Sequence, residues 1–248
     1  MEQKLAGKVV LVTGGGRRVG AAISRHLHAA GADLVIHYHH SAGEAQALAS
    51  ELNATRPGSA TPLGCDLMDL RTLASLVEAT HARHGRLDVL VNNASTFYPT
   101  PIGEITAQQF DDLVGTNFRA PLFLSQAAAK ELKASKGLIL NIADIHGMRP
   151  LRHHVVYSPA KAALIMLTQS LARELAPDVR VNAIAPGPVL FPETGLTEER
   201  KAAIIDMTLL KRQGSPEDIA RAALFFAADA PYVTGQVLAV DGGRGTTT

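Results

Sequence analysis

The chain contains few of the features that mark secreted, membrane-bound or nucleic-acid-binding proteins. It has one cysteine, Cys65, so an internal disulfide is excluded. Basic and acidic residues balance, at 24 and 23, and no block of like charge indicates a nucleic-acid or membrane surface. The first residues are charged, unlike a secretory signal, and the longest apolar stretches are interrupted, as in 163–172 by Thr168 and Gln169. We therefore expect a cytoplasmic protein with no nucleic-acid partner, no membrane partner and no metal site.

What is present is an alternation of short apolar runs and amphipathic segments. Runs rich in Val, Ile and Leu indicate buried strands at 8–12, 33–38, 87–94, 137–143, 179–186 and 236–240. Helical patterns lie between them at 19–32, 44–54, 70–85 and 159–176. With 46% apolar residues and no linker, this pattern predicts one α/β domain over residues 1–248. The expected architecture is a Rossmann-type, doubly wound parallel sheet with helices on both faces.

One irregular segment, 187–201, is broken by proline and glycine before a helical AAIIDM. Long irregular segments in compact domains often cover a binding site. We predict a mobile substrate lid at about 189–210.

The first strand is followed by a glycine-rich loop, 13–20, and then by a helix. Glycines such as Gly14 and Gly20 allow this turn to approach a pyrophosphate at the helix N-terminus. The order strand, loop, helix predicts a dinucleotide site, with Arg17 and Arg18 adding charge beside the phosphates or the substrate.

The end of the second strand indicates which dinucleotide is bound. NAD sites usually place an acidic residue there, on the ribose 2′-hydroxyl. This chain instead has imidazoles and hydroxyls that can donate to a 2′-phosphate, together with the nearby Arg17 and Arg18. The residues are His37, Tyr38, His39, His40 and Ser41. They predict NADPH as the cofactor, although any single histidine could be an exposed strand end.

Tyr157 and Lys161 stand four residues apart, so both side chains lie on one face if the segment is helical. An ammonium near the phenol is expected to lower the tyrosine pKa, so that the tyrosine can supply a proton near neutral pH. The lysine can also hold the nicotinamide ribose.

These features occur with Asn92–Ser95 after a strand, Asn117 in a helical stretch, and the C-terminal segment 233–243. Together they resemble the short-chain dehydrogenase/reductase family over essentially the whole chain. The resemblance implies that Asn117 orders the lysine through a water and that the protein forms a homotetramer. Members of the family usually have a serine thirteen residues before the tyrosine, whereas this chain has Asp144.

Asp144 changes the expected substrate. A carboxylate beside a ketone would oppose the developing alkoxide, whereas a carboxyl group can bond and protonate a ring nitrogen. The alternative is that Asp144 is a solvated loop residue and another group does the work of the serine. A combination of features resembles the pteridine reductases: Arg18 in the glycine-rich loop, the segments 37–41 and 92–101, and Asp144 with Tyr157 and Lys161.

That resemblance implies NADPH-dependent reduction of dihydropterins, and of dihydrofolate or oxidised pterins, to the tetrahydro forms. Asp144 and Tyr157 would donate the proton to the pterin. Arg18, Ser95 and Phe97 would line the pterin. Phe97 would stack on it, unless this ring belongs to the core. The remaining cofactor contacts implied are Asp66 and Leu67 near adenine, at the end of a third strand region, Asn93, Ala94 and Ser95 beside its ribose, and Pro186 and Gly187 at the nicotinamide. Two alternatives stay open: a 3-oxoacyl-thioester or other carbonyl reductase, and a non-catalytic NADP-binding regulator.

Overall fold

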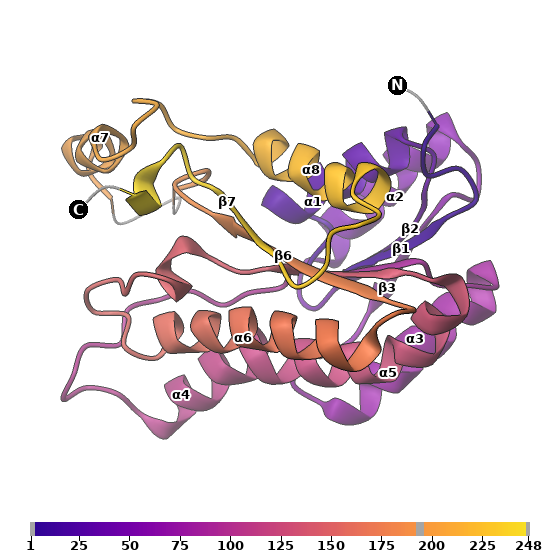
Figure 1. The fold of residues 1–248 in the computed structure, drawn as a ribbon, viewed down its shortest axis with the longest axis horizontal. Coiled ribbons are helices and arrows are strands. Elements are labelled where there is room, and N and C mark those ends of the chain that lie inside the picture. Colours follow the sequence, from indigo (N-terminus) through magenta and orange to yellow (C-terminus); the bar gives the residue numbers. More distant parts are fainter. Residues whose placement is uncertain (1–2, 192–195, 247–248) are drawn as a thin grey trace.

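The computed structural model describes residues 3–191 and 196–246 and consists of one seven-stranded parallel sheet between two helical layers (Figure 1). The strands lie in the order β3-β2-β1-β4-β5-β6-β7, and every neighbouring pair is parallel. Their bounds are β1 (Val9–Val12), β2 (Asp33–Tyr38), β3 (Ala60–Gly64), β4 (Val89–Asn92), β5 (Leu138–Ile142), β6 (Arg180–Pro186) and β7 (Val237–Val240). The strand order reverses between β1 and β4, which is where ligands bind in such sheets.

The helices cover both faces of the sheet (Figure 1). One layer contains α1 (Arg18–Ala29), α2 (Ala42–Thr55) and α8 (Pro216–Leu224). The other contains α3 (Leu70–His84), α5 (Ala120–Ser135) and α6 (Tyr157–Leu175). Two shorter helices, α4 (Ala107–Val114) and α7 (Glu198–Asp206), lie at the end of the sheet that carries the site.

Alternation along the strands divides the core into two halves. On β1, Val10 and Val12 pack among the α1, α2 and α8 residues, whereas Leu11 packs with α3, α5 and α6. All three side chains are fully buried. Because a parallel sheet is covered on both faces, its strands are apolar on both, and this is why they read as continuous apolar runs. The predicted doubly wound Rossmann-type fold is confirmed.

Several elements differ from the expectation. The apolar runs did not indicate β3, whose sequence ATPLG contains Pro62 and is only half-buried. Proline is tolerated there because β3 is an edge strand. The helical stretch expected around Asn117 consists of α4, a π-helical turn and α5, whose bounds were not predicted, and α8 was not expected. Irregular segments follow β4 and β5 as well as β6. The predicted lid is partly the helix α7, which begins after its cap Thr197, and residues 192–195 lie outside the described part.

No helix in the described part of the chain is both long enough and apolar enough to cross a membrane.

Candidate active site

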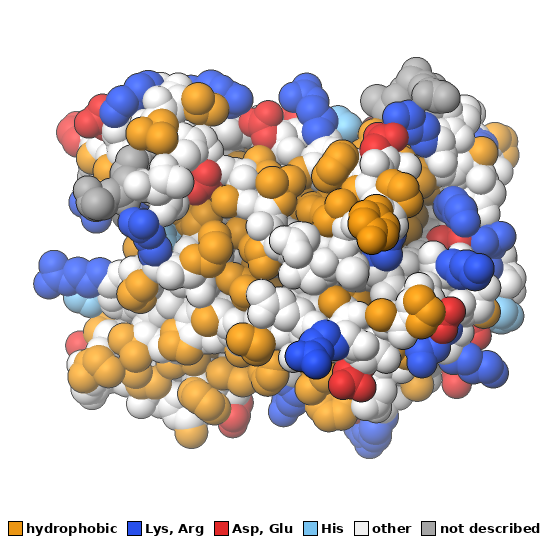
Figure 2. All heavy atoms as spheres, viewed as in Figure 1, with side chains coloured by type: hydrophobic (Ala, Val, Ile, Leu, Met, Phe, Trp, Pro, Cys, Tyr) orange, Lys and Arg blue, Asp and Glu red, His pale blue; other side chains and the backbone are white. Residues whose placement is uncertain are grey.

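A cleft of about 1510 Å³ opens at the carboxyl ends of the strands. Its walls come from the glycine-rich loop, from the ends of β2 to β6, and from the irregular segments after β4, β5 and β6. Figure 2 shows the surface hollowed between the part that carries α7 and the layer below it. The cleft brings together most of the residues singled out in the sequence.

The glycine-rich loop is shaped by contacts that leave no space for side chains. Gly14 has φ +58°, and a Cβ on Gly20 would lie 2.2 Å from the Gly14 carbonyl oxygen. The Asn93 side chain donates hydrogen bonds to the carbonyls of Thr13 and Gly14, at 2.9 and 3.1 Å. The end of β4 therefore holds the loop at the start of α1, and Gly14, Gly20 and Asn93 all line the cleft.

Arg18 adopts a backbone conformation that favours glycine. Its φ is +51°, in the left-handed region, which costs a non-glycine residue roughly 1–2 kcal/mol. The Arg18 guanidinium reaches across the cleft and donates to the Phe191 carbonyl at 3.2 Å. Arg18 therefore links the glycine-rich loop to the segment after β6.

The expectation for His37 and Tyr38 needs correction. His37 is buried: its Nδ1 accepts the Gly14 N–H at 3.2 Å and its Nε2 lies 3.1 Å from the Cys65 carbonyl. Burial lowers the pKa of His37 to about 4, so the ring is neutral and both nitrogens are engaged within the protein. Tyr38 points to the opposite face of the sheet, over Gly64 and the core. Neither side chain is placed to donate to a phosphate.

His37 also lines the cleft, although both of its ring nitrogens are engaged, and four other residues near the end of β2 face the cleft. Arg17, His39, His40 and Ser41 all line it, and the two imidazole rings lie 3.6 Å apart between centroids. The cleft also includes a carboxylate that the sequence argument did not consider, Glu44 in the first turn of α2. These side chains come from two turns that only the fold brings together.

The remaining predicted cofactor contacts also line the cleft: Asp66, Leu67, Ala94, Ser95, Pro186 and Gly187. Asp66 follows β3, and its Oδ1 accepts the Met68 N–H at 2.8 Å, which fixes the turn. Gly187 is packed closely, since a Cβ there would lie 2.6 Å from the Asp241 Cα.

Asp144 and Tyr157 are joined by a hydrogen bond. The Tyr157 hydroxyl donates to Asp144 Oδ2 at 2.8 Å, and Asp144 Oδ1 accepts the His146 N–H at 2.8 Å. Tyr157 is the first residue of α6 and Asp144 follows β5, so helix and strand end hold the pair. Asp144 is therefore a fixed member of the site.

The predicted lowering of the Tyr157 pKa is wrong. Burial and the negative charge of Asp144 raise the Tyr157 pKa well above its usual value, because both disfavour the phenolate. Lys161 lies one helical turn on, fully buried, with Nζ donating to the Ile142 carbonyl at 2.9 Å. Its Nζ is 5.7 Å from the Tyr157 ring centroid, and burial lowers its own pKa to about 8. In this arrangement Tyr157 is a phenol, and Lys161 does not make it a phenolate.

Asn117 contacts the segment after β4 and makes no direct hydrogen bond to Lys161. Its Oδ1 accepts the Ser95 hydroxyl at 2.7 Å, and its Nδ2 donates to the carbonyls of Thr96 and Leu113, each at 2.9 Å. Asn117 lies in a π-helical turn, Gly115–Arg119, between α4 and α5. It holds Ser95 and the loop before Phe97 in place.

Phe97 faces the cleft and is not part of the core. It is 46% exposed, its ring stacks on His154 with centroids 4.7 Å apart, and its edge packs against Tyr157 at 4.8 Å. The sequence analysis missed His154, which no motif marks. Thr100 and His154 form an isolated parallel bridge that joins the segments after β4 and β5. Three arginines that line the cleft are likewise marked by no motif: Arg152, Arg200 and Arg244.

Comparisons with known proteins place this site in a family. A family model described as enoyl-(acyl carrier protein) reductase matches residues 16–244. Pteridine reductase 1 of Leishmania tarentolae is 36% identical, over 96% of this chain and 96% of its own length. A 3-oxoacyl-[acyl-carrier-protein] reductase of Synechocystis is 35% identical, over 96% and 97% of the two chains. A blue fluorescent protein from a metagenomic library, solved in complex with NADPH, superposes with a TM-score of 0.91 at 36% identity, over 97% of this chain and 99% of its own. These matches, with the fold and the Tyr157–Lys161 pair, show that the chain belongs to the short-chain dehydrogenase/reductase family.

Proposed function

We propose that this protein is an NADPH-dependent pteridine reductase that converts dihydropterins to tetrahydropterins. The observation that carries the proposal is the hydrogen bond from the Tyr157 hydroxyl to Asp144 Oδ2, at 2.8 Å. It puts a carboxylate and a phenol side by side in the cleft, where a carbonyl reductase of this family would have a serine. The similarity to a pteridine reductase over almost the whole chain supports the same conclusion.

The residues of the cleft fit a bound NADPH. The close approach of Gly20 to Gly14 leaves backbone open at the N-terminus of α1, where a pyrophosphate can bind. Arg17, His39, His40 and Ser41 would hold the 2′-phosphate, and Lys161 with Tyr157 would hold the nicotinamide ribose. When bound, the cofactor supplies a hydride to a ring carbon.

Asp144 and Tyr157 would supply the accompanying proton to a ring nitrogen. Tyr157 is protonated at neutral pH because its pKa is raised, and it can pass its proton to a nitrogen that gains electron density. Asp144 accepts the hydrogen bond from the Tyr157 hydroxyl and also lines the open cleft. A proton from the cleft can therefore reach the tyrosine through Asp144 and restore the phenol. A carboxylate at this place would instead destabilise the alkoxide that forms when a ketone is reduced.

The second candidate is a 3-oxoacyl-thioester reductase, because a relative with that activity is 35% identical. A non-catalytic NADP-binding regulator is less well supported, since Tyr157 and Lys161 are both in place on one face of α6. Purified protein incubated with NADPH and either dihydrobiopterin or an acetoacetyl thioester separates the three. Oxidation of NADPH with the pterin only is expected. Oxidation with the thioester only would contradict the proposal, and no oxidation with either would favour the regulator. A homotetramer and a cytoplasmic location stay predictions.

We expect a preference for NADPH over NADH of about tenfold or more, the equivalent of one charge-assisted contact of about 1.4 kcal/mol. The reason is that hydrogen-bond donors line the cleft where the 2′-phosphate would bind: Arg17, His39, His40 and Ser41. Glu44, which also lines the cleft, would oppose a phosphate and is the residue that could reduce the preference. The check is kcat/KM for each cofactor at fixed dihydropterin. Equal values would contradict the assignment of the 2′-phosphate site.

Phe97→Ala should raise the KM for the pterin several-fold while the KM for NADPH changes by less than about twofold. The stacking face that it removes is worth roughly 1 kcal/mol beyond area burial. Phe110→Ala is the matched control, because that ring is similarly exposed, at 51%, and does not line the cleft. An unchanged pterin KM in Phe97→Ala would show that Phe97 does not contact the substrate.

A further inference from the structure

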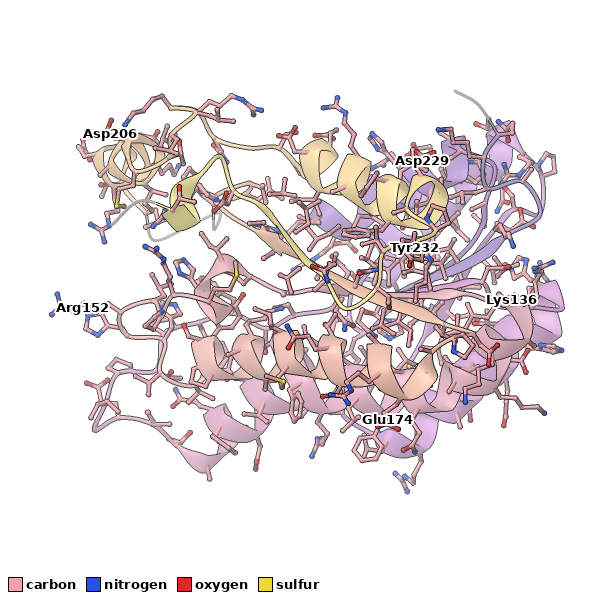
Figure 3. The ribbon with its side chains drawn as sticks, viewed as in Figure 1. Lys136, Arg152, Glu174, Asp206, Asp229 and Tyr232 are labelled. Atoms are coloured by element: carbon pink, nitrogen blue, oxygen red, sulfur yellow. The ribbon has the colours of Figure 1, made fainter. Side chains whose placement is uncertain are left out.

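Three arginines line the cleft and have no part in the mechanism above. Arg152 lies in the segment between β5 and α6, Arg200 in the first turn of α7, and Arg244 in a turn directly after β7. Arg152 projects outward from its loop at the open side of the cleft (Figure 3). Three segments far apart in the sequence therefore place guanidinium groups around the same cleft as Asp144 and Phe97.

Two of these charges have no partner among residues 3–191 and 196–246. The guanidinium groups of Arg152 and Arg200 make no hydrogen bond and no ion pair with any residue that the structure describes. The three carboxylates of α7 have other partners: Glu198 pairs with Lys201 at 2.7 Å, Asp206 pairs with Lys211 at 3.1 Å, and Glu199 is hydrogen-bonded at the start of the helix with the Thr197 side chain. Arg200 is left to face the cleft, where an anion could pair with it.

Arg244 is half-buried and held beside α7. The Asp241 carboxylate accepts the N–H groups of Gly243 and Gly245, at 2.9 and 2.6 Å, and so fixes the turn that carries Arg244. One guanidinium nitrogen of Arg244 is 3.5 Å from the Ile204 carbonyl of α7, so this side chain lies against the helix that carries Arg200.

The charges of Arg200 and of two carboxylates act on Arg244. Burial lowers the pKa of Arg244, the charge of Arg200 lowers it further, and the charges of Asp144 and Asp241 raise it. Both of those carboxylates are occupied by other donors, Asp144 by the Tyr157 hydroxyl and the His146 N–H. An anion beside Arg200 would offset the repulsion between Arg200 and Arg244 and could accept two-pronged hydrogen bonds from Arg200.

We propose that Arg152 and Arg200, with the positive charge of Arg244 nearby, form an anion subsite, which binds a carboxylate or phosphate on a flexible tail of the substrate. The inference rests on the proposed function for the position of the reacting ring, against Phe97 and Tyr157. It extends that function by selecting substrates whose ring carries a charged tail, such as a pteroylglutamate, over pterins with a neutral side chain.

The test compares ligands that differ only in the charge of the tail. One pair is dihydrofolate and its dimethyl ester. The other is an acetoacetyl thioester of pantetheine 4′-phosphate and the same thioester of pantetheine. For each pair, KM and, with NADP⁺ present, Kd are measured for wild type, for Arg200→Gln and for Arg152→Gln combined with Arg200→Gln. Arg173→Gln, exposed on α6 and outside the cleft, is the matched control.

We expect wild type to bind the charged member of one pair at least tenfold more tightly than the neutral member. The double variant should lose most of that ratio, Arg200→Gln should lose part of it, and Arg173→Gln should keep it. The dihydrofolate pair points to a carboxylate tail and the thioester pair to a phosphate tail. Because both substituted side chains are exposed, folding should be preserved.

Two results would overturn the subsite. One is a wild-type protein with no preference for charge in either pair, and the other is a ratio that survives in the double variant. The proposed function fails separately, if dihydrobiopterin, dihydrofolate and its ester are not reduced by wild type. In that case the thioester pair still tests the subsite. If wild type prefers the phosphorylated thioester and the double variant does not, the anion subsite is supported although the substrate is not a pterin.

Discussion

Asp144→Ser is expected to lower kcat for dihydrobiopterin by at least about a hundredfold, the lower range of what a positioned proton-transfer group contributes. The substitution removes the acceptor of the Tyr157 hydroxyl, at 2.8 Å, and with it the carboxyl that links the phenol to the open cleft. Affinity for NADPH should stay within about threefold of wild type, because the contacts expected to hold the cofactor come from Lys161, Tyr157 and the glycine-rich loop. The variant therefore separates the binding of NADPH from the chemical step.

The measurements are the Kd for NADPH, from its fluorescence, and kcat on dihydrobiopterin. Asp229→Ser makes the same chemical change at an exposed residue paired with Lys4, remote from the cleft, and should leave both values unchanged. A kcat near that of wild type in Asp144→Ser would show that Asp144 is not the proton partner. A gain of activity on an acetoacetyl thioester in the same variant would indicate that Asp144 sets the substrate class.

Acid is expected to destabilise the protein through His37. Its pKa of about 4 when folded lies below the usual 6.5, so between these values the unfolded chain binds a proton that the folded chain does not. The contribution to stability is therefore complete above about pH 6.5 and is lost as pH falls toward 4. By linkage the loss is about 2 kcal/mol at pH 5 and about 3 kcal/mol at pH 4. Burial also lowers the pKa of His28 and His84, which adds to the effect in the same direction.

Urea unfolding of the unliganded protein at pH 7.5, 5 and 4 tests this expectation. His37→Gln should be less stable than wild type at pH 7.5, because it disturbs the bonds to Gly14 and Cys65, but its stability should fall less with acid. His40→Gln is the control, since that ring is exposed just beyond the same strand and is not among the groups that shift the pKa of His37, and the loss of stability of this variant in acid should match wild type. Equal slopes for His37→Gln and wild type would contradict the burial of a neutral imidazole.

Local patterns were sufficient to predict the frame of this protein. The apolar runs gave six of the seven strands, because strands covered on both faces must be apolar on both. The glycine spacing at 14 and 20 predicted a close turn, and a Cβ at Gly20 would indeed collide with Gly14. The spacing of Tyr157 and Lys161 predicted one helical face, and both lie in the first turns of α6. The family inferred from these motifs is confirmed by its relatives.

Only the tertiary structure decided how side chains at the ends of strands are used. His37 and Tyr38 are neighbours in the sequence but lie on opposite faces of β2, and the packing of β1 and β3 around His37 turns it into a buried link. The pKa of Tyr157 depends on its burial and on its distance to Asp144, which lies thirteen residues earlier in the chain. The helical spacing of Tyr157 and Lys161 carries no information about either quantity. The convergence of Arg152, Arg200 and Arg244 on one cleft follows from three separate segments. The sequence determined the elements, because periodicity and glycine positions are local properties. The electrostatics of the site were decided by the fold, because charge interactions and desolvation depend on distances between residues that are remote in the chain.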